Sequence, residues 1–211
     1  MIHLEHGFRS VSRLGRKDVR GLGGPEGNER LTGATAAVLL VLLAVEGVTI
    51  VFLRPLLSVH IFVGMLLIPP VVLKLASTGW RFVRYYTGAV NYRVKGPPHR
   101  FMRLLAPLVV VATASVFATG VALILLGPHS GRGLVLGLHK VSFVVWFVVT
   151  GIHVLVYAAR IPRLAAGDYR RSERTDGSFL RRGAVAAALV AGVTLAAATF
   201  PLADAWLHRA G

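Results

Sequence analysis

Hydrophobic residues along the chain are gathered into five long runs that are separated by polar segments. The runs cover residues 31–53, 58–79, 104–126, 134–159 and 184–202. Each run is about as long as the twenty apolar residues that an α-helix needs to cross the hydrocarbon core of a bilayer. No strand-like alternation competes with this pattern, and backbone polar groups inside a bilayer must be satisfied within the protein. The pattern therefore predicts an all-α membrane protein with five transmembrane helices.

The polar segments divide the chain into four predicted parts. These are a poorly ordered basic cytoplasmic tail (1–30), a four-helix transmembrane bundle (31–159), a basic cytoplasmic loop (160–183), and a fifth helix with a short external C-terminus (184–211). Within the bundle, short loops at 54–57 and 127–133 predict that helices one and two, and helices three and four, are antiparallel neighbours. The fifth run contains no histidine, so we interpret it as an appended helix.

Basic residues are distributed unevenly, and their distribution predicts the orientation. Six Lys or Arg precede the first run, six lie between the second and third, and seven lie between the fourth and fifth. The opposite side is left with four, which are Arg54, Arg132, Lys140 and Arg209. Cytoplasmic loops of membrane proteins are enriched in Lys and Arg. We therefore expect a multi-pass protein of the cytoplasmic membrane with its N-terminus inside and its C-terminus outside. Basic loops beside anionic lipid account for the net charge of +15 without a nucleic-acid partner.

The composition narrows the chemistry that the chain can support. The chain has no cysteine, which excludes disulfides, thiolate metal sites, iron–sulfur clusters and thiol catalysis. The polar segments hold no phosphate-binding loop, dinucleotide fingerprint or nucleophile motif, and they are too short to house a catalytic domain. Any chemistry therefore takes place within the membrane or on a partner.

Two histidines interrupt the fourth run, "GLHKVSFVVWFVVTGIHVL" (137–155). His139 and His153 are fourteen residues apart, so on a helix they point within about 40° of each other and lie roughly 21 Å apart along the axis. His60 opens the second run, which crosses the membrane in the same direction, and Lys74 follows it after fourteen residues. The spacing predicts an external level with His60 and His139. It also predicts an internal level with Lys74 and His153.

Small residues follow the same period in the other two runs. Gly47 lies fourteen residues after Gly33 in the first run, and Gly120 lies fourteen residues after Ala106 in the third. A flat macrocycle held between four helices takes ligands from two of them and presses closely against the other two, where glycine makes room. Gly47 and Gly120 are both predicted at the external level.

This combination resembles the transmembrane b-type cytochromes, in which a four-helix bundle holds two haems b across the membrane. Each haem in that family is bound by one histidine from each of two helices, and glycines on the other two helices clear the space. The resemblance covers residues 31–159. It implies that His60 and His139 are the axial ligands of an external haem, that His153 is a ligand of an internal one, and that the glycines of the external level clear space for the porphyrin.

The chain departs from the family pattern at Lys74, where a histidine is expected. A neutral lysine amine can bind haem iron, but this side chain lies near the cytoplasmic end of its run and can instead reach water. The pair Pro69–Pro70 is expected to kink the second helix between the two levels and to disturb the alignment of Lys74 with His60. We therefore expect one haem b outside and a degenerate or unusually ligated second site inside.

These residues also have plainer interpretations. The two external histidines can be interfacial, the glycines can serve helix packing, and His153 can be a buried polar residue or a proton relay. Glu46 is the only acid within a run. It is expected to carry protons, to face a quinone pocket, or to hydrogen-bond to a neighbouring helix. Arg54, His129 and Arg132 border the external level, where they pair with haem propionates or are interfacial charges.

Bis-histidine iron has no open position for oxygen, so the resemblance implies electron transfer. We predict a membrane cytochrome b that passes electrons between the quinone pool and a soluble or peripheral redox partner, as the membrane subunit of an oxidoreductase. One alternative is a self-contained transmembrane reductase of metal or quinone, which would need two haems. Another is a haem-free scaffold or carrier embedded in membrane lipid. Bound haem, and its stoichiometry, separate the three.

Overall fold

The computed structural model describes residues 23–94, 96, 100–128, 132–160, 162, 166 and 177–210. Its elements are α2 (Gly24–Val51), α3 (Leu53–Tyr86), α4 (Val90–Val94), α5 (Arg100–Leu126), α6 (Arg132–Tyr157), the 3₁₀ helix η1 (Ala158–Arg160), α8 (Ser178–Thr199), the 3₁₀ helix η3 (Phe200–Ala203) and α9 (Asp204–Ala210). Five of the described helical segments are long and apolar enough to cross a membrane. The prediction of an all-helical protein with five apolar spans is therefore confirmed for this part of the chain.

The first span begins earlier than the sequence predicts. α2 starts at Gly24, inside the stretch that was expected to be a loop. Pro25 lies in the first turn, where its missing N–H would have no partner in any case, and Glu26 places a negative charge at the positive end of the helix dipole. These are helix-start signals, and they override the glycines around them. Residues 1–22 of the predicted tail lie outside the described residues.

The expected loop at 54–57 is absent, because α3 already begins at Leu53. Only Phe52 separates the two helices, and one non-helical residue, Leu56 (φ −111°, ψ 17°), bends the start of α3. Pro55 sits in that first turn, where a helix tolerates proline. The chain therefore reverses direction between α2 and α3 with almost no connecting segment.

The Pro69–Pro70 pair, which was expected to kink the second helix, lies inside the continuous helix α3. Within α3, only Leu56 departs from helical dihedral angles. Pro70 has no N–H to donate to the Leu66 carbonyl one turn earlier. That carbonyl instead lies against the backbone of Gly192 on α8, so close that a side chain at Gly192 would overlap it. Neighbouring helices can supply weak Cα–H contacts to a carbonyl freed in this way.

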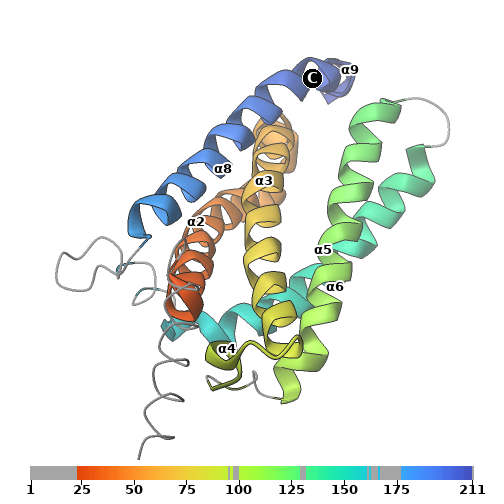
Figure 1. The fold of residues 1–211 in the computed structure, drawn as a ribbon. Helices are drawn as coiled ribbons and strands as arrows, with labels where there is room; N and C mark the ends of the chain where they lie inside the picture. The colour runs from red at the N-terminus through yellow and green to blue at the C-terminus, as the bar shows by residue number, and fades with distance from the viewer. Residues whose placement is uncertain are drawn as a thin grey trace, which may run out of the picture.

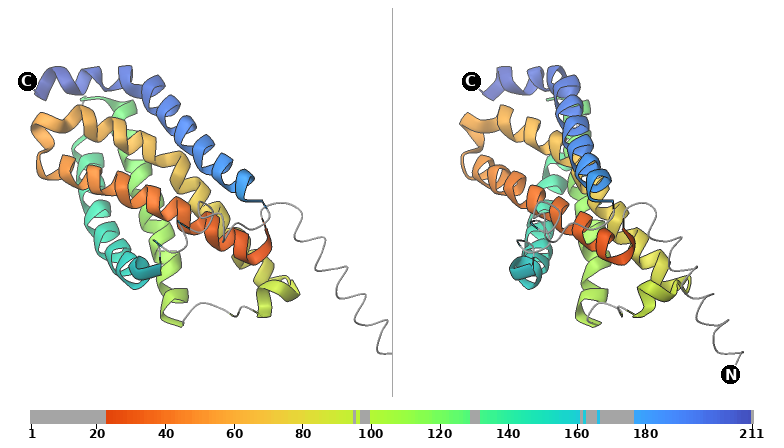
Figure 2. Two further views of the ribbon diagram at one scale, coloured as in Figure 1. Left: turned by 90° about the vertical axis from the view of Figure 1, so that its left-hand side faces the viewer. Right: turned by 60° about the vertical axis from the view of Figure 1, so that its left-hand side comes forward.

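α3 is the central helix of the fold, with α2 and α8 packed along it (Figure 1). Figure 2 shows α2, α3 and α8 running side by side. The fifth helix is thus not a mere appendage: Ala196 of α8 is buried against Met65 and Leu66 of α3. α5 and α6 form a separate antiparallel hairpin. α6 packs extensively against α5, and none of its described residues is buried.

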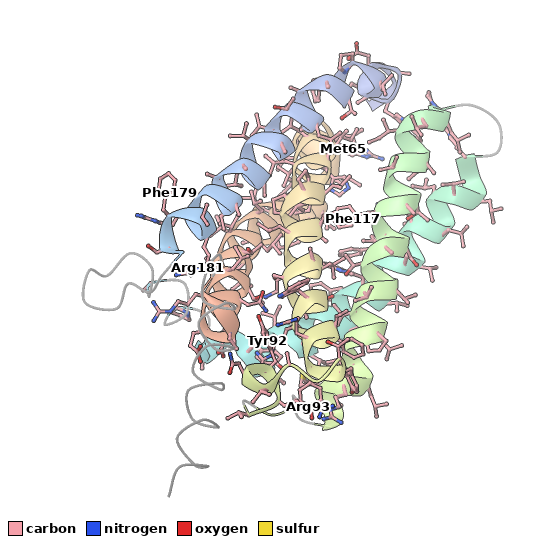
Figure 3. All side chains as sticks on the ribbon, viewed as in Figure 1. Met65, Tyr92, Arg93, Phe117, Phe179 and Arg181 are labelled. Atoms are coloured by element: carbon pink, nitrogen blue, oxygen red, sulfur yellow. The ribbon has the colours of Figure 1, made fainter. Side chains whose placement is uncertain are left out.

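Side chains of α5 join the hairpin to the three-helix layer. Phe117 of α5 packs against a cluster formed by Leu39, Val63 and Leu67 of α2 and α3 (Figure 3). Near the C-terminus, the indole of Trp206 on α9 donates to the Leu123 carbonyl of α5 at 3.0 Å. The C-terminal residues expected to form only a short tail are therefore helical as far as they are described, and they tie α8 to the hairpin.

Many large apolar side chains of the spanning helices are exposed. On α6 they include Val141, Val144, Phe147 and Leu155. Such a surface is suited to contact with membrane lipid and not with water.

Candidate functional site

The external level is organised around His60, near the start of α3. Its Nδ1 lies 2.8 Å from Oε1 of Glu46 and 3.1 Å from Oγ1 of Thr49, both on α2. Glu46 and Thr49 are three residues apart and so share one face of their helix. The Thr49 hydroxyl donates its proton to the Glu46 backbone carbonyl at 2.6 Å. Nδ1 of His60 therefore carries the proton and donates it to the Glu46 carboxylate and the Thr49 hydroxyl oxygen. Because a neutral imidazole has only one ring N–H, this assignment leaves Nε2 without a proton.

His139 of α6 has the same arrangement with a different partner. Its Nδ1 lies 3.0 Å from Oγ1 of Thr119 on α5. Thr119 donates its only hydroxyl proton to the Ser115 carbonyl at 2.7 Å, so its oxygen accepts from the imidazole. Nδ1 of His139 then carries the proton, and Nε2 presents its lone pair. The two histidines thus share the tautomer in which Nε2 is free to bind a metal.

The structure brings the two external histidines near each other. His60 and His139 are close enough for their charges to interact, although they lie on helices that have no extensive packing contact. Gly120 explains part of this placement, because a Cβ at that position would lie 3.2 Å from Cε1 of His139. Gly120 thus makes room for the imidazole ring. A Cβ at Gly47 would meet nothing within 4 Å, so this glycine borders space that no described protein atom fills.

At the internal level, Lys74 is held by the neighbouring helix. Its Nζ donates to the Thr32 carbonyl of α2 at 2.8 Å, and the Thr32 hydroxyl donates to Ser77 Oγ at 2.9 Å. Asn28 of α2 adds a further bond, from its amide nitrogen to the Ser77 carbonyl at 3.0 Å. Lys74 therefore belongs to a polar network that joins α2 and α3, and its ammonium protons have a partner within the membrane span.

His153 lies on α6 near Lys74, close enough for the two charges to interact. Its Nδ1 is buried, and so is the hydroxyl of Thr150 one turn earlier, yet neither atom has a hydrogen-bond partner among the described residues. The His153 ring lies 5.0 Å from the ring of Tyr157. This level differs from the external one, where each imidazole nitrogen Nδ1 is matched with an acceptor.

Two of the residues predicted to border the external level are arginines whose surroundings the structure describes. Arg54 is exposed at the start of α3. Arg132 donates to the Pro128 carbonyl at 3.2 Å, and its guanidinium lies 5.7 Å from the centre of the Trp206 ring. His129 lies outside the described residues.

Sequence reasoning missed the two threonines that orient the histidines. Thr49 and Thr119 were visible as hydroxyl residues inside apolar runs, and Thr119 stands directly before Gly120. Their importance depends on which helices become neighbours, since each bonds to an imidazole on another helix. Glu46 was visible as the only acid in a run, and the structure matches the simpler of its interpretations, a hydrogen bond to a neighbouring helix.

The described residues contain no group of three or more His, Asp or Glu side chains that could hold a metal. A haem already supplies four nitrogen ligands, and the protein adds only axial ones.

Comparisons of the chain with protein-family models, curated proteins and solved structures find no match.

Proposed function

We propose that the chain binds one haem b between α3 and α6, with His60 and His139 as axial ligands, and that it transfers electrons within the membrane. One observation carries this proposal: both imidazoles have Nδ1 committed to an acceptor on a neighbouring helix, which leaves both Nε2 atoms unprotonated. Ligating histidines in metalloproteins typically have this second hydrogen bond, which fixes tautomer and ring orientation.

In this proposal the protein holds the haem, orients its ligands and shields the iron from oxygen. When bound, the haem supplies a one-electron couple between ferric and ferrous iron. His60 and His139 would fill both axial positions, which keeps oxygen from the iron. Gly47 is exposed with open space beside it, and α6 has no buried residue, so neither obstructs a group bound beside these helices.

The resemblance to transmembrane b-type cytochromes supports a role between the membrane quinone pool and a peripheral redox partner, as the membrane subunit of an oxidoreductase. An external haem is well placed for a partner on that face. A self-contained transmembrane reductase would need a second haem inside. The bond from Lys74 to the Thr32 carbonyl argues against Lys74 as its ligand, so we favour the subunit role.

Three alanine variants test the proposal. We expect His60→Ala and His139→Ala each to lose the haem, whereas His153→Ala retains about one haem per chain, because removing an axial ligand abolishes a bis-histidine site. The measurement is haem per purified chain, determined as the pyridine haemochrome, with His153→Ala as the matched control for loss of a histidine within a span. Retention of haem by both external variants, or its loss only in His153→Ala, would refute this assignment.

A further inference from the structure

We infer that Glu46 is a positioning residue whose carboxylate, bonded to Nδ1 of His60, lowers the reduction potential of the iron that His60 binds. The inference rests on the proposed function and deepens it, because it names the residue that sets the potential of the external site.

The contact is short and partly shielded from solvent. Oε1 of Glu46 lies 2.8 Å from Nδ1 of His60, and the two side chains are only 12% and 22% exposed, respectively. A hydrogen bond to a charged acceptor is roughly twice as strong as one between neutral groups, and a low local dielectric strengthens it further. The carboxylate draws the Nδ1 proton toward itself, which makes Nε2 a more basic ligand. A more basic ligand stabilises ferric over ferrous iron, so it lowers the potential.

The local structure holds this carboxylate in place. Oε2 of Glu46 lies 3.3 Å from the Thr49 hydroxyl on the same helix. On the facing helix, Gly64 stands one turn after His60, and a Cβ there would lie 3.6 Å from Oε1. Gly64 thus lies beside the carboxylate, at a distance where a methyl group would make ordinary van der Waals contact. An acid inside a membrane span is costly, and here its bond to His60 offsets that cost.

The second ligand provides an internal comparison. His139 donates to a hydroxyl, which is neutral, whereas His60 donates to a carboxylate. Only one of the two axial imidazoles is therefore strengthened by a charge. This asymmetry makes the effect specific to Glu46.

The test is an equilibrium redox titration of the haem-loaded protein, together with electron paramagnetic resonance of its ferric form. We expect Glu46→Gln, which keeps size and removes charge, to raise the midpoint potential. At a fixed potential near the wild-type midpoint, the ferrous-to-ferric ratio should increase about tenfold, equivalent to about 59 mV for one electron. The ferric resonance should shift as the axial field of His60 weakens. Glu46→Asp, which keeps the charge but shortens the reach, should raise the midpoint less.

The control is Thr199→Ala on α8, which removes a hydroxyl that bonds only within its own helix. Its midpoint and resonance should equal those of the wild type. If both Glu46 variants bind haem at the wild-type potential, Glu46 does not tune the iron, and the proposed function still stands. If the wild type binds no haem, the proposed function fails and this inference fails with it.

Discussion

At the residue scale, the behaviour of each histidine is decided by the atom that faces its Nδ1. His60 has a carboxylate there, His139 has a hydroxyl, and His153 has no partner among the described residues. The first two therefore present Nε2 without a proton, as the proposed ligand role requires. The third has a buried nitrogen, and an unpaired buried polar group costs about 1–3 kcal/mol.

Spacing alone was enough to single out these histidines, because a fourteen-residue separation fixes their direction and level on any straight helix. It could not reveal Thr49, Thr119 or Gly64. Each of them acts on a side chain of another helix, and which helix faces which is decided by packing.

Gly47 offers a test at this scale. A Cβ at Gly47 meets no described protein atom within 4 Å and the position is exposed, so Gly47→Leu should leave the fold intact. If the porphyrin fills that space, overlap costing about 1–3 kcal/mol should weaken haem retention about tenfold. The measurement compares haem per chain and melting temperature with those of Gly79→Leu, a matched substitution at another open helical position. Equal haem content in both variants would show that Gly47 does not border the porphyrin.

At the scale of the elements, the contact between α3 and α8 depends on a proline and a glycine together. Pro70 leaves the Leu66 carbonyl without its helical donor, and Gly192 brings the backbone of α8 against that same carbonyl. The five spans followed directly from the hydrophobic runs. The ends of the spans could not be predicted from these runs, because Pro25 and Pro55 lie in helix starts where the local composition favours loops.

Gly192→Ala tests this contact. The added methyl group would overlap the Leu66 carbonyl, so α8 must move away from α3, and we expect destabilisation of about 1–3 kcal/mol. Thermal unfolding in detergent measures the effect. Gly183→Ala, on the same helix but with open space around it, should be neutral or slightly stabilising because alanine favours helix over glycine. Equal melting temperatures for the two variants would contradict the close packing of α8.

At the scale of the whole molecule, the chain is a three-helix layer of α2, α3 and α8 beside the α5–α6 hairpin. The sequence pattern suggested a four-helix bundle with an added fifth helix. The pattern could not distinguish such a bundle from a three-helix layer beside a hairpin. The lipid-facing and protein-facing sides of membrane spans are about equally apolar, so hydrophobicity gives little indication of which helices are neighbours. The small residues of α8, which allow its approach to α3, were the available signal.

The orientation of the molecule can be tested directly because the chain has no cysteine. We expect a membrane-impermeant maleimide to label Ala205→Cys but not Thr87→Cys in intact cells, since the basic segments place the α3–α4 turn inside. Both positions are exposed, and labelling after lysis controls for reactivity. Labelling of Thr87→Cys alone in intact cells would mean that the orientation is reversed.

The central claim is that one haem b lies between α3 and α6. Its most direct test is the reduced-minus-oxidised visible spectrum of the purified wild-type protein, expressed with adequate haem supply and quantified per chain. We predict a b-type α-band corresponding to about one haem per chain. Absence of haem would contradict the account, and two haems per chain would mean that the internal level around His153 also holds iron.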